Sequence, residues 1–363
     1  MIRRPTLPRL LACAMAMAAH LFPLLLCALL LAVAAIGTAD AQERPETPAA
    51  APACETGTNA LPALERDGRL EALRHEAAAT PNGTGRLWRV ERAGVAPSFL
   101  FGTMHLSDPR ILALPAPAEA ALASARRVVI ETTDVLDPAA MAAALLSRPD
   151  LTTLKPGETL ETLLGSDELA RLAPLLAERS LPLAAIRTLQ PWFVTMSLTV
   201  PPCEAARVAS GAAVLDVALA ARAKAAGQPV AGLESAVEQI TALASLPLDM
   251  QADNLVASAE MADRLPDLFE TMIALYLRDE IALIEPATTA MEPAGTDDAA
   301  SIAITQRFEE TVVRQRNGVM TERLGPLLTD GGQFVAVGAL HLPGETGLVE
   351  ALRRAGWQVT RAD

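Results

Sequence analysis

Hydrophobic and polar positions alternate at the start of the folded part of the chain. Residues 86–91 alternate and predict a strand, residues 93–97 contain the glycine and proline of a turn, and residues 98–102 predict a second strand. An alanine-rich helix is predicted at about 117–125. It leads into a short apolar run at 126–131, which predicts a buried strand that ends in a carboxylate. This region therefore predicts a hairpin, a helix and a buried strand.

The pattern becomes mainly helical from residue 137 to about 300, where apolar residues recur at helical spacing. Amphipathic helices are predicted at 160–178, 212–226, 235–246 and 250–283. One predicted strand, 229–234, interrupts them and again ends in a carboxylate. Residues 286–298 are rich in turn formers and predict a mobile loop.

The C-terminal part alternates strands and helices again. A long helix is predicted at 302–328, ended by the glycine pair 331–332. A strand at 333–337, a helix at 347–355 and a strand at 357–360 predict a right-handed, parallel βαβ unit. The whole pattern predicts an α/β fold, in which helices flank a central mixed, largely parallel sheet and a large helical insertion occupies the middle of the chain.

The first residues have the features of an export signal. A basic start precedes an almost wholly apolar segment, residues 10–37, and residues 39–41 offer a cleavage site. The apolar segment is long enough to span a bilayer, so it is predicted to be either a cleaved signal peptide (1–41) or an uncleaved membrane anchor. Either outcome predicts an exported protein, periplasmic, secreted or anchored. A Pro/Ala-rich linker with a short helix around 61–79 is predicted at 42–84, before one domain at 85–363.

The charge of the chain excludes one class of partner. The formal net charge of −13 becomes −15 once residues 1–41, with their three arginines and one aspartate, are removed. Binding to nucleic acid needs clustered Lys and Arg, so a nucleic-acid partner is not expected. Cys54 and Cys203 would remain, and they could form one disulfide bond or stay as two thiols. The oligomeric state is left open.

One short motif, G-x-x-H, occurs twice, each time directly after an apolar run; it is called the repeated phrase below. Gly102 lies three residues before His105, and Gly338 lies three residues before His341. Of the other two histidines, His20 lies in the apolar N-terminal segment and His75 in the polar lead-in. A glycine at this position lets the chain turn sharply or lets another backbone approach closely. The repeated phrase is therefore the first candidate for chemistry.

Two carboxylates lie at comparable positions. Glu131 and Glu234 both follow predicted strands, and ligands collect at the carboxyl ends of strands in open α/β sheets. Two imidazoles and one or two carboxylates form a plausible ligand set for a divalent metal. The alternatives are that His105 and His341 are hydrogen-bonded packing residues and that Glu234 only neighbours a helix cap. A buried Glu131 is harder to explain in this way, because an unpartnered buried charge is costly.

Arg316 and Asn317 in the long predicted helix are the other candidates. They could belong to a solvated face, or they could donate hydrogen bonds to an oxyanion that develops on a metal-bound carbonyl. Asn317 precedes Gly318 within a helix, where neither residue is favoured, which suggests that something other than helix propensity holds it there.

Taken together, these motifs over about 85–363 resemble the TraB/GumN family, which includes the animal Tiki proteins and is distantly similar to erythromycin esterase-like and haem-binding ChaN-like proteins. The resemblance implies a metal-dependent peptidase that uses Mn²⁺ or Co²⁺, with Zn²⁺ open from the ligand types. It implies His105, Glu131 and His341 as metal ligands or catalytic groups, with Arg316 and Asn317 as supporting residues. Thr133 stands where that family often has an acidic residue, which leaves Asp134 as a possible substitute.

Three functions follow as hypotheses. The first is an exported metallohydrolase that cleaves a peptide or protein substrate, with Glu131 or Glu234 as ligand or base. The second is a non-catalytic protein that binds a metal, haem or a peptide. The third is an esterase-like hydrolase.

Overall fold

A twisted sheet organises the structure, a computed structural model that describes residues 57–291 and 305–363. Its strands are β1 (Leu87–Glu91), β2 (Ser98–Thr103), β3 (Arg127–Ile130), β4 (Val230–Gly232), β5 (Gln333–Gly338) and β6 (Gln358–Arg361). Their order is β4-β3-β5-β2-β1-β6. Strands β4, β3, β5 and β2 are mutually parallel, whereas β1 pairs antiparallel with both β2 and β6. The predicted mixed, largely parallel α/β sheet is confirmed.

The central strands are buried on both faces, which explains their near-continuous apolar sequences. In β5, Phe334 and Ala336 belong to the larger hydrophobic cluster, while Val335 and Val337 belong to a second cluster on the opposite face. This strict alternation follows from the two-residue period of a strand. The sheet thus lies between two helical layers.

Helices α5 (Ala116–Ser124) and α12 (Leu215–Ala225) pack on the face of the larger cluster. Helices α18 (Gln315–Asp330) and α19 (Leu348–Arg354) cover the other face. The remaining helices are α2 (Leu61–Arg66), α3 (Leu70–Ala77), α4 (Pro109–Leu112), α6 (Pro138–Leu146), α7 (Leu160–Leu163), α8 (Ser166–Glu178), α9 (Leu183–Ile186), α10 (Pro191–Thr199), α11 (Pro202–Ala209), α13 (Ala236–Ala244), α14 (Leu248–Glu260), α15 (Leu265–Leu277) and α16 (Ile284–Thr289).

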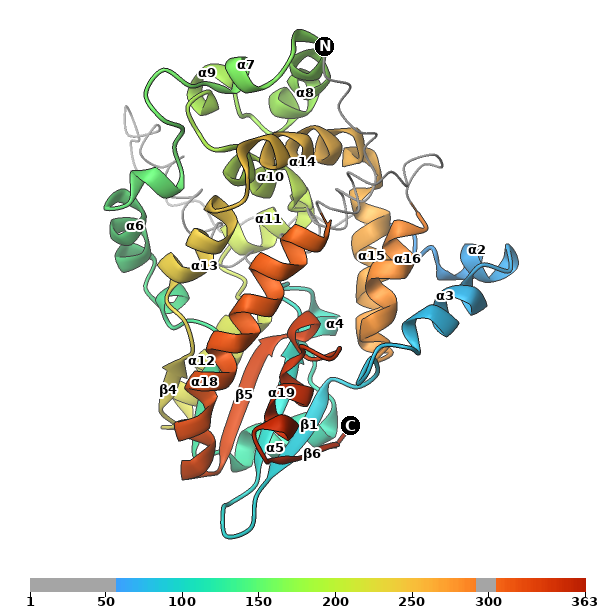
Figure 1. The fold of residues 1–363 in the computed structure, drawn as a ribbon, viewed down its shortest axis with the longest axis vertical. Helices are drawn as coiled ribbons and strands as arrows, with labels where there is room; N and C mark the ends of the chain where they lie inside the picture. The colour runs from blue at the N-terminus through green and yellow to red at the C-terminus, as the bar shows by residue number, and fades with distance from the viewer. Residues whose placement is uncertain (1–56, 292–304) are drawn as a thin grey trace.

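The predicted helical insertion has a core of its own. Leucines of α7 and α8 pack with apolar residues of α10 and α14 in a cluster separate from those on the sheet. Figure 1 shows these helices gathered at the end of the molecule away from the strands. These helices of the insertion therefore extend the domain away from the sheet, whereas α12 and β4, which belong to the same part of the chain, pack on the sheet or pair within it.

Several predicted boundaries need correction. The predicted helix 250–283 is two helices, α14 and α15, because the chain bends at residues 262–264, and the start of the predicted loop 286–298 lies within α16. The predicted long helix contains a π-helical segment, η5 (Glu309–Arg314), before α18. The last strand is parallel in direction to β5 but does not pair with it. The hairpin β1–β2 lies between them, and β6 pairs antiparallel with β1, so the two strands of the predicted parallel βαβ unit run in the same direction without being neighbours.

The predicted linker is described from residue 57 onward. Its single predicted helix is two, α2 and α3, separated around Gly68, whose φ of 71° suits glycine. Leu61, Leu64 and Leu70 are buried in the larger core cluster, so this segment packs onto the domain.

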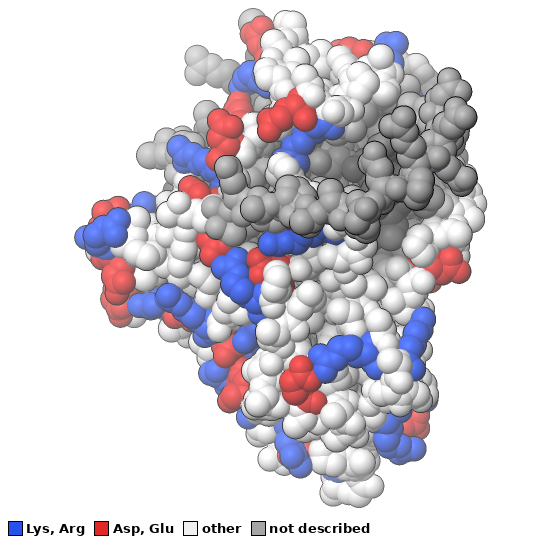
Figure 2. All heavy atoms as spheres, turned by 180° about the vertical axis from the view of Figure 1, so that it is seen from behind, with Lys and Arg blue, Asp and Glu red and all other residues white. Residues whose placement is uncertain are grey.

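The predictions for the first residues concern positions outside the described ones, namely the signal or anchor at 10–37 and Cys54. Within 57–291 and 305–363, no helix is both long and apolar enough to cross a membrane. Cys203, on α11, forms a disulfide bond. Figure 2 shows basic and acidic side chains interspersed along one side of the face seen from behind.

Candidate functional site

Three predicted residues meet at the carboxyl ends of β3, β5 and β2. Sheet register pairs Thr103 with Gly338 and Ile130 with Ala336, so the residues that follow these strands converge. One oxygen of Glu131, Oε1, lies 3.7 Å from His105 Nε2 and 3.9 Å from His341 Nε2. The side chains of all three residues are at most 5% exposed. The two repeated phrases therefore form two halves of one buried site around a shared carboxylate.

The two motif glycines have different positions in this arrangement. A Cβ on Gly102 would lie 2.8 Å from Leu342 Cδ1 and 2.9 Å from Ala339 Cα, which is closer than real Cβ atoms approach. Gly102 thus lets the turn η6 (Ala339–His341) lie directly against β2. Gly338 has an ordinary φ of −50°, and its amide donates to Glu131 Oε1 at 2.6 Å.

His105 is held by a carboxylate. Its Nδ1 lies 2.5 Å from Asp216 Oδ2, and the hydroxyl of Thr103 donates to the other oxygen of Asp216 at 2.9 Å. Burial alone would lower the pKa of His105, but Asp216, helped by Glu131, outweighs burial and raises this pKa to about 10. In the absence of a metal, the imidazole of His105 is therefore protonated on both ring nitrogens and positively charged at neutral pH.

His341 is held by an amide. The Nδ2 group of Asn317 donates to the carbonyl of Thr346 at 3.0 Å and to that of His341 at 3.4 Å. Carbonyls only accept hydrogen bonds, so these two contacts turn Oδ1 toward His341 Nδ1, 2.6 Å away. His341 Nδ1 must then be the donor, which puts the lone pair of the neutral ring on Nε2, the atom that faces Glu131.

An arginine joins the two predicted carboxylates. Arg316 Nη2 donates to Glu131 Oε2 at 2.6 Å and to Glu234 Oε2 at 2.8 Å, and Arg316 Nε donates to Glu234 as well. Gln239 Nε2 also bridges the two carboxylates, at 3.0 and 3.3 Å. Burial opposes ionisation of Glu131, but Arg316 and the two histidines outweigh it and hold the pKa of Glu131 well below its ordinary value. Glu131 is therefore a carboxylate fixed in orientation.

The donor types at the site, two imidazoles and a carboxylate, are types that divalent metals accept. Atoms that share one metal with bonds of about 2.1 Å lie about 3–4 Å apart, and the two Nε2–Oε1 distances fall in this range. His105 Nε2 is buried and has no hydrogen-bond partner among the described residues. Each Nδ1 is held by an oxygen acceptor, the usual arrangement behind a metal-binding histidine. Within 57–291 and 305–363, no group of three or more His, Cys, Asp or Glu side chains is arranged so that it could hold a metal ion as the side chains stand.

The charge of the site is consistent with this fit. The site contains three carboxylates and one guanidinium: Glu131 and Glu234 pair with Arg316, and Asp216 contacts His105. With neutral histidines, the formal charges leave an excess of two negative charges in a buried region. A divalent cation would neutralise that excess, and in its absence the proton on His105 does so in part.

Comparison with known proteins shows the family to which the chain belongs. A model described as the TraB/PrgY/gumN family matches residues 86–361. The chain belongs to this family. The resemblance inferred from the motifs is thereby confirmed. No curated protein and no solved structure matches the chain.

The side chains of the candidate residues predicted from the sequence lie in one cluster: His105, Glu131, Glu234, Arg316, Asn317 and His341. The carboxylate of Asp134 accepts from the amide of Ala236 at the start of α13. His75 is exposed on α3.

Sequence reasoning missed Asp216, and it did not assign a role to Thr103 or Gln239. Asp216 lies in the first turn of α12, where an acidic residue is common for reasons of helix polarity alone. The one available signal was that α12 contains no other acidic residue.

Proposed function

We propose that this protein is an exported, metal-dependent hydrolase that cleaves peptide bonds. The observation that carries the proposal is the arrangement of His105 and His341, whose Nε2 atoms both face Glu131 Oε1 while their Nδ1 atoms are held from behind. Two histidines and a carboxylate that leave further positions open are a recurrent ligand set of catalytic metals. Membership of the family supports the site but does not by itself assign an activity.

His105, His341 and Glu131 would hold the metal, with Mn²⁺, Co²⁺ or Zn²⁺ compatible with these ligand types. A metal bound there would supply Lewis-acid activation of a water and of a carbonyl oxygen. Asp216 and Asn317 fix the rings of the two histidines, each of which presents Nε2 to the same point. Because the pKa of Glu131 is low, this residue is ionised and needs no deprotonation before it coordinates.

Arg316 and Asn317 are best assigned to positioning. Arg316 donates to both glutamates and to the carbonyl of Val312, and Asn317 uses its amide on His341 and Thr346. These contacts favour a role in holding the ligands over the predicted role at an oxyanion. Glu234 has both oxygens engaged by Arg316, which favours it as the anchor of that arginine over a role as base.

Export is supported by two features of the chain. The N-terminal residues have the basic start and apolar segment of an export signal. The disulfide bond of Cys203 suits a protein that works in an oxidising compartment such as the periplasm or the cell exterior.

The test compares purified wild type with His105→Ala and His341→Ala, with His75→Ala as the matched control. Metal content is measured by elemental analysis, and hydrolysis is measured on a peptide library and on simple esters. The proposal predicts one metal per chain and peptide cleavage in wild type and control, and loss of both in the two site variants. Site variants that fold and keep full metal content and cleavage would contradict it.

A non-catalytic metal- or peptide-binding function is the second candidate. It is favoured by the same contacts that engage the donors of Arg316 and Asn317 within the protein, because these leave neither residue assigned to a substrate. Stoichiometric metal in wild type without cleavage of any peptide or ester would support this candidate and reject the hydrolase.

A further inference from the structure

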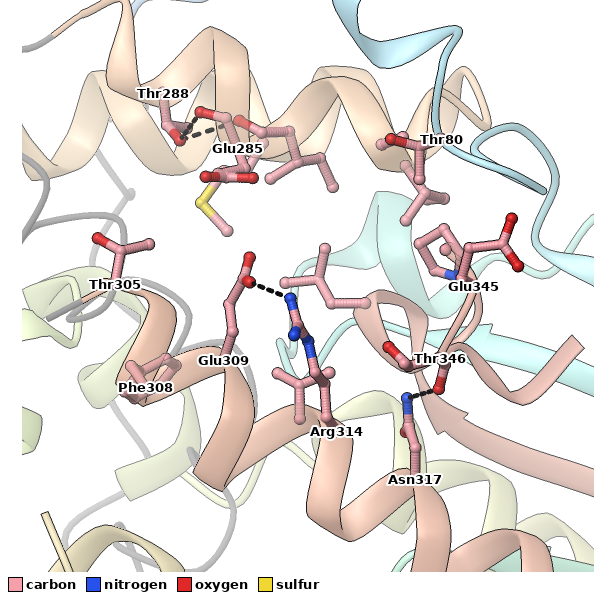
Figure 3. A pocket seen from close by; sticks show the side chains of 18 residues that line it. Thr80, Glu285, Thr288, Thr305, Phe308, Glu309, Arg314, Asn317, Glu345 and Thr346 are labelled. Atoms are coloured by element: carbon pink, nitrogen blue, oxygen red, sulfur yellow. Dashed lines mark hydrogen bonds and ion pairs between the residues drawn. The ribbon is translucent and has the colours of Figure 1, made fainter. Parts of the chain in front are cut away.

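The two halves of the site have different surroundings. On the His341 side, Asn317 lies in the wall of a cavity of about 480 Å³, and Figure 3 shows it donating there to the carbonyl of Thr346. Residues 103–110, which include His105, do not line that cavity. His105 is only 3% exposed, so its position is set by contacts inside the domain.

The backbone around His105 is held in a tight turn. The amide of Leu106 donates to the carbonyl of Met104 at 2.7 Å, which makes His105 the central residue of a three-residue turn. The next peptide unit joins Leu106 to Ser107. Its carbonyl accepts at 3.1 Å from the amide of Leu215, the first residue of α12. Because α12 also carries the carboxylate that contacts the ring, this helix fixes both the ring of His105 and the backbone that follows it.

The amide of the same peptide unit is held by a buried carboxylate on α11. Glu204 Oε1 accepts from the amide of Ser107 at 2.5 Å, and Glu204 Oε2 lies 3.3 Å from Arg207 Nη1. Within α11, whose residues are all described, Glu204 alone is buried. The residue before it, Cys203, forms a disulfide bond, so the start of this helix is fixed covalently. A buried carboxylate is costly unless hydrogen bonds compensate it, which points to a use for Glu204 beyond the packing of α11.

Loss of this acceptor would leave a buried amide unpaired. Ser107 is 3% exposed, so its N–H cannot reach water unless the chain moves. Such a movement displaces His105, two residues earlier, from Asp216 and Glu131, whereas a metal site tolerates errors of only about 0.5 Å. From these contacts we infer that Glu204 is a positioning residue for the His105 half of the site and acts through the peptide unit that follows Leu106. The inference rests on the proposed function for its effect on metal binding, but not for its effect on the ring of His105.

Metal binding measures the first effect, by calorimetric titration of the metal-free protein with Mn²⁺. Glu204→Leu removes the acceptor at similar size and should weaken binding about 10-fold, at the lower end of the range for loss of an outer partner. Glu204→Gln keeps an oxygen for the amide of Ser107 and should recover most of that loss. Glu204→Asp keeps the charge but retracts the carboxylate by one carbon, so its affinity should fall between those two. It also supplies the reading if the leucine variant does not fold.

Glu270→Leu is the matched control. Glu270 Oε1 lies 2.7 Å from Arg110 Nη1, so this substitution also removes a carboxylate that holds the segment after His105, but it removes no contact of the peptide unit between Leu106 and Ser107. It should leave the affinity for Mn²⁺ unchanged. A leucine or aspartate variant at position 204 that folds with wild-type affinity, a glutamine variant as weak as the leucine variant, or an equal loss in the control would overturn the role of Glu204.

The second measurement is NMR of the metal-free protein at one pH, which needs no metal binding. The proton on His105 Nδ1 lies in a buried hydrogen bond to Asp216 and should give a downfield resonance protected from exchange with water. Glu204→Leu should lose this resonance and keep that of His341, while Glu270→Leu keeps both.

The two measurements separate the possible failures. A wild type that binds no metal but shows this pattern of resonances rejects the proposed metal site and leaves the role of Glu204 standing. A wild type that binds metal, together with a leucine variant that keeps the His105 resonance, rejects the role of Glu204 and leaves the metal site standing.

Discussion

The two halves of the site share one sequence phrase but are supported in different ways. His105 follows β2 in an irregular segment and contacts a carboxylate, Asp216, on α12. His341 lies in the turn η6 after β5 and contacts an amide, Asn317, on α18. One support carries a formal charge and the other is neutral.

This difference teaches that orientation and basicity are separable in the site. Both supports fix Nδ1 and turn Nε2 toward Glu131, so both histidines are oriented. Only the support of His105 is charged, and Asp216 together with Glu131 raises the pKa of His105 to about 10. A second carboxylate in place of Asn317 would add a further negative charge to a buried region that already contains three carboxylates and one arginine. We infer that the neutral support limits the charge that a divalent metal must neutralise.

The largest expected effect is the loss of metal affinity when either histidine is replaced. Replacing His105 or His341 by alanine removes one proposed ligand, so metal affinity should fall by more than about 100-fold, beyond the range typical for loss of an outer partner. Titration of the apoprotein with Mn²⁺ measures this. The two losses should be equal within a few-fold, since both ring nitrogens face one carboxylate oxygen. A full loss in one variant and none in the other would show that the two phrases do not form one site.

The next largest effect compares metal binding after loss of each supporting side chain, Asp216 behind His105 and Asn317 behind His341. Asp216→Asn removes the charge behind His105 and should weaken metal binding by about 100-fold, whereas Asn317→Leu should weaken it by about 10-fold. The carboxylate has the larger effect because it both orients its histidine and makes it a stronger donor. Calorimetric titration with Mn²⁺ at fixed pH measures both. Equal losses would mean that orientation alone matters.

A pH effect on the metal-free protein should appear on the His105 side only. The folded-state pKa of His105, about 10, lies above its ordinary value of 6.5, so the folded protein retains a proton that the unfolded chain releases. This stabilisation is fully present below pH 6.5 and is lost as the pH rises through 10. Urea unfolding in the presence of a chelator should therefore show decreasing stability over this window, and Asp216→Asn should flatten the decrease. A wild-type stability that rises over the same window would contradict the assignment.

The smallest expected effect is on folding stability and concerns the hydroxyl of Thr103, which donates to Asp216. Thr103→Val removes its hydrogen bond to a buried carboxylate and should lower the free energy of unfolding by about 1.5 kcal/mol. Thr103→Ser, which keeps the hydroxyl, should recover most of that loss. His341 has no equivalent test, because its support is an amide that is itself held by backbone carbonyls. A valine variant as stable as wild type, with a less stable serine variant, would show that packing of the methyl group matters and that the hydrogen bond does not.

The sequence predicts the strand ends of this fold better than its sheet order. Apolar runs that end in Glu131, Glu234 or a repeated phrase identify the residues at one sheet edge, because burial on both faces leaves a continuous hydrophobic signal. The same signal does not say which strands are neighbours. For this reason the position of β6, beyond the hairpin β1–β2, could not be read from its pattern.

Helical contributions to the site are the harder part to predict. Asn317 is indicated by the sequence because an asparagine before a glycine is unfavourable within a helix, and Arg316 is its neighbour. Asp216 was missed because an acidic residue in the first turn of a helix has an ordinary local explanation. Only the tertiary packing of α12 against β3 and β2 brings it to His105. The bend between α14 and α15 was also missed, because the apolar period continues across it.

The most direct test of the account is anomalous X-ray diffraction from crystals of the metal-loaded protein, recorded at the absorption edge of the bound metal. The account predicts one strong anomalous peak within bonding distance of His105 Nε2, His341 Nε2 and Glu131 Oε1. A peak elsewhere in the molecule, or fully loaded protein in which these three atoms contact only one another, would contradict it.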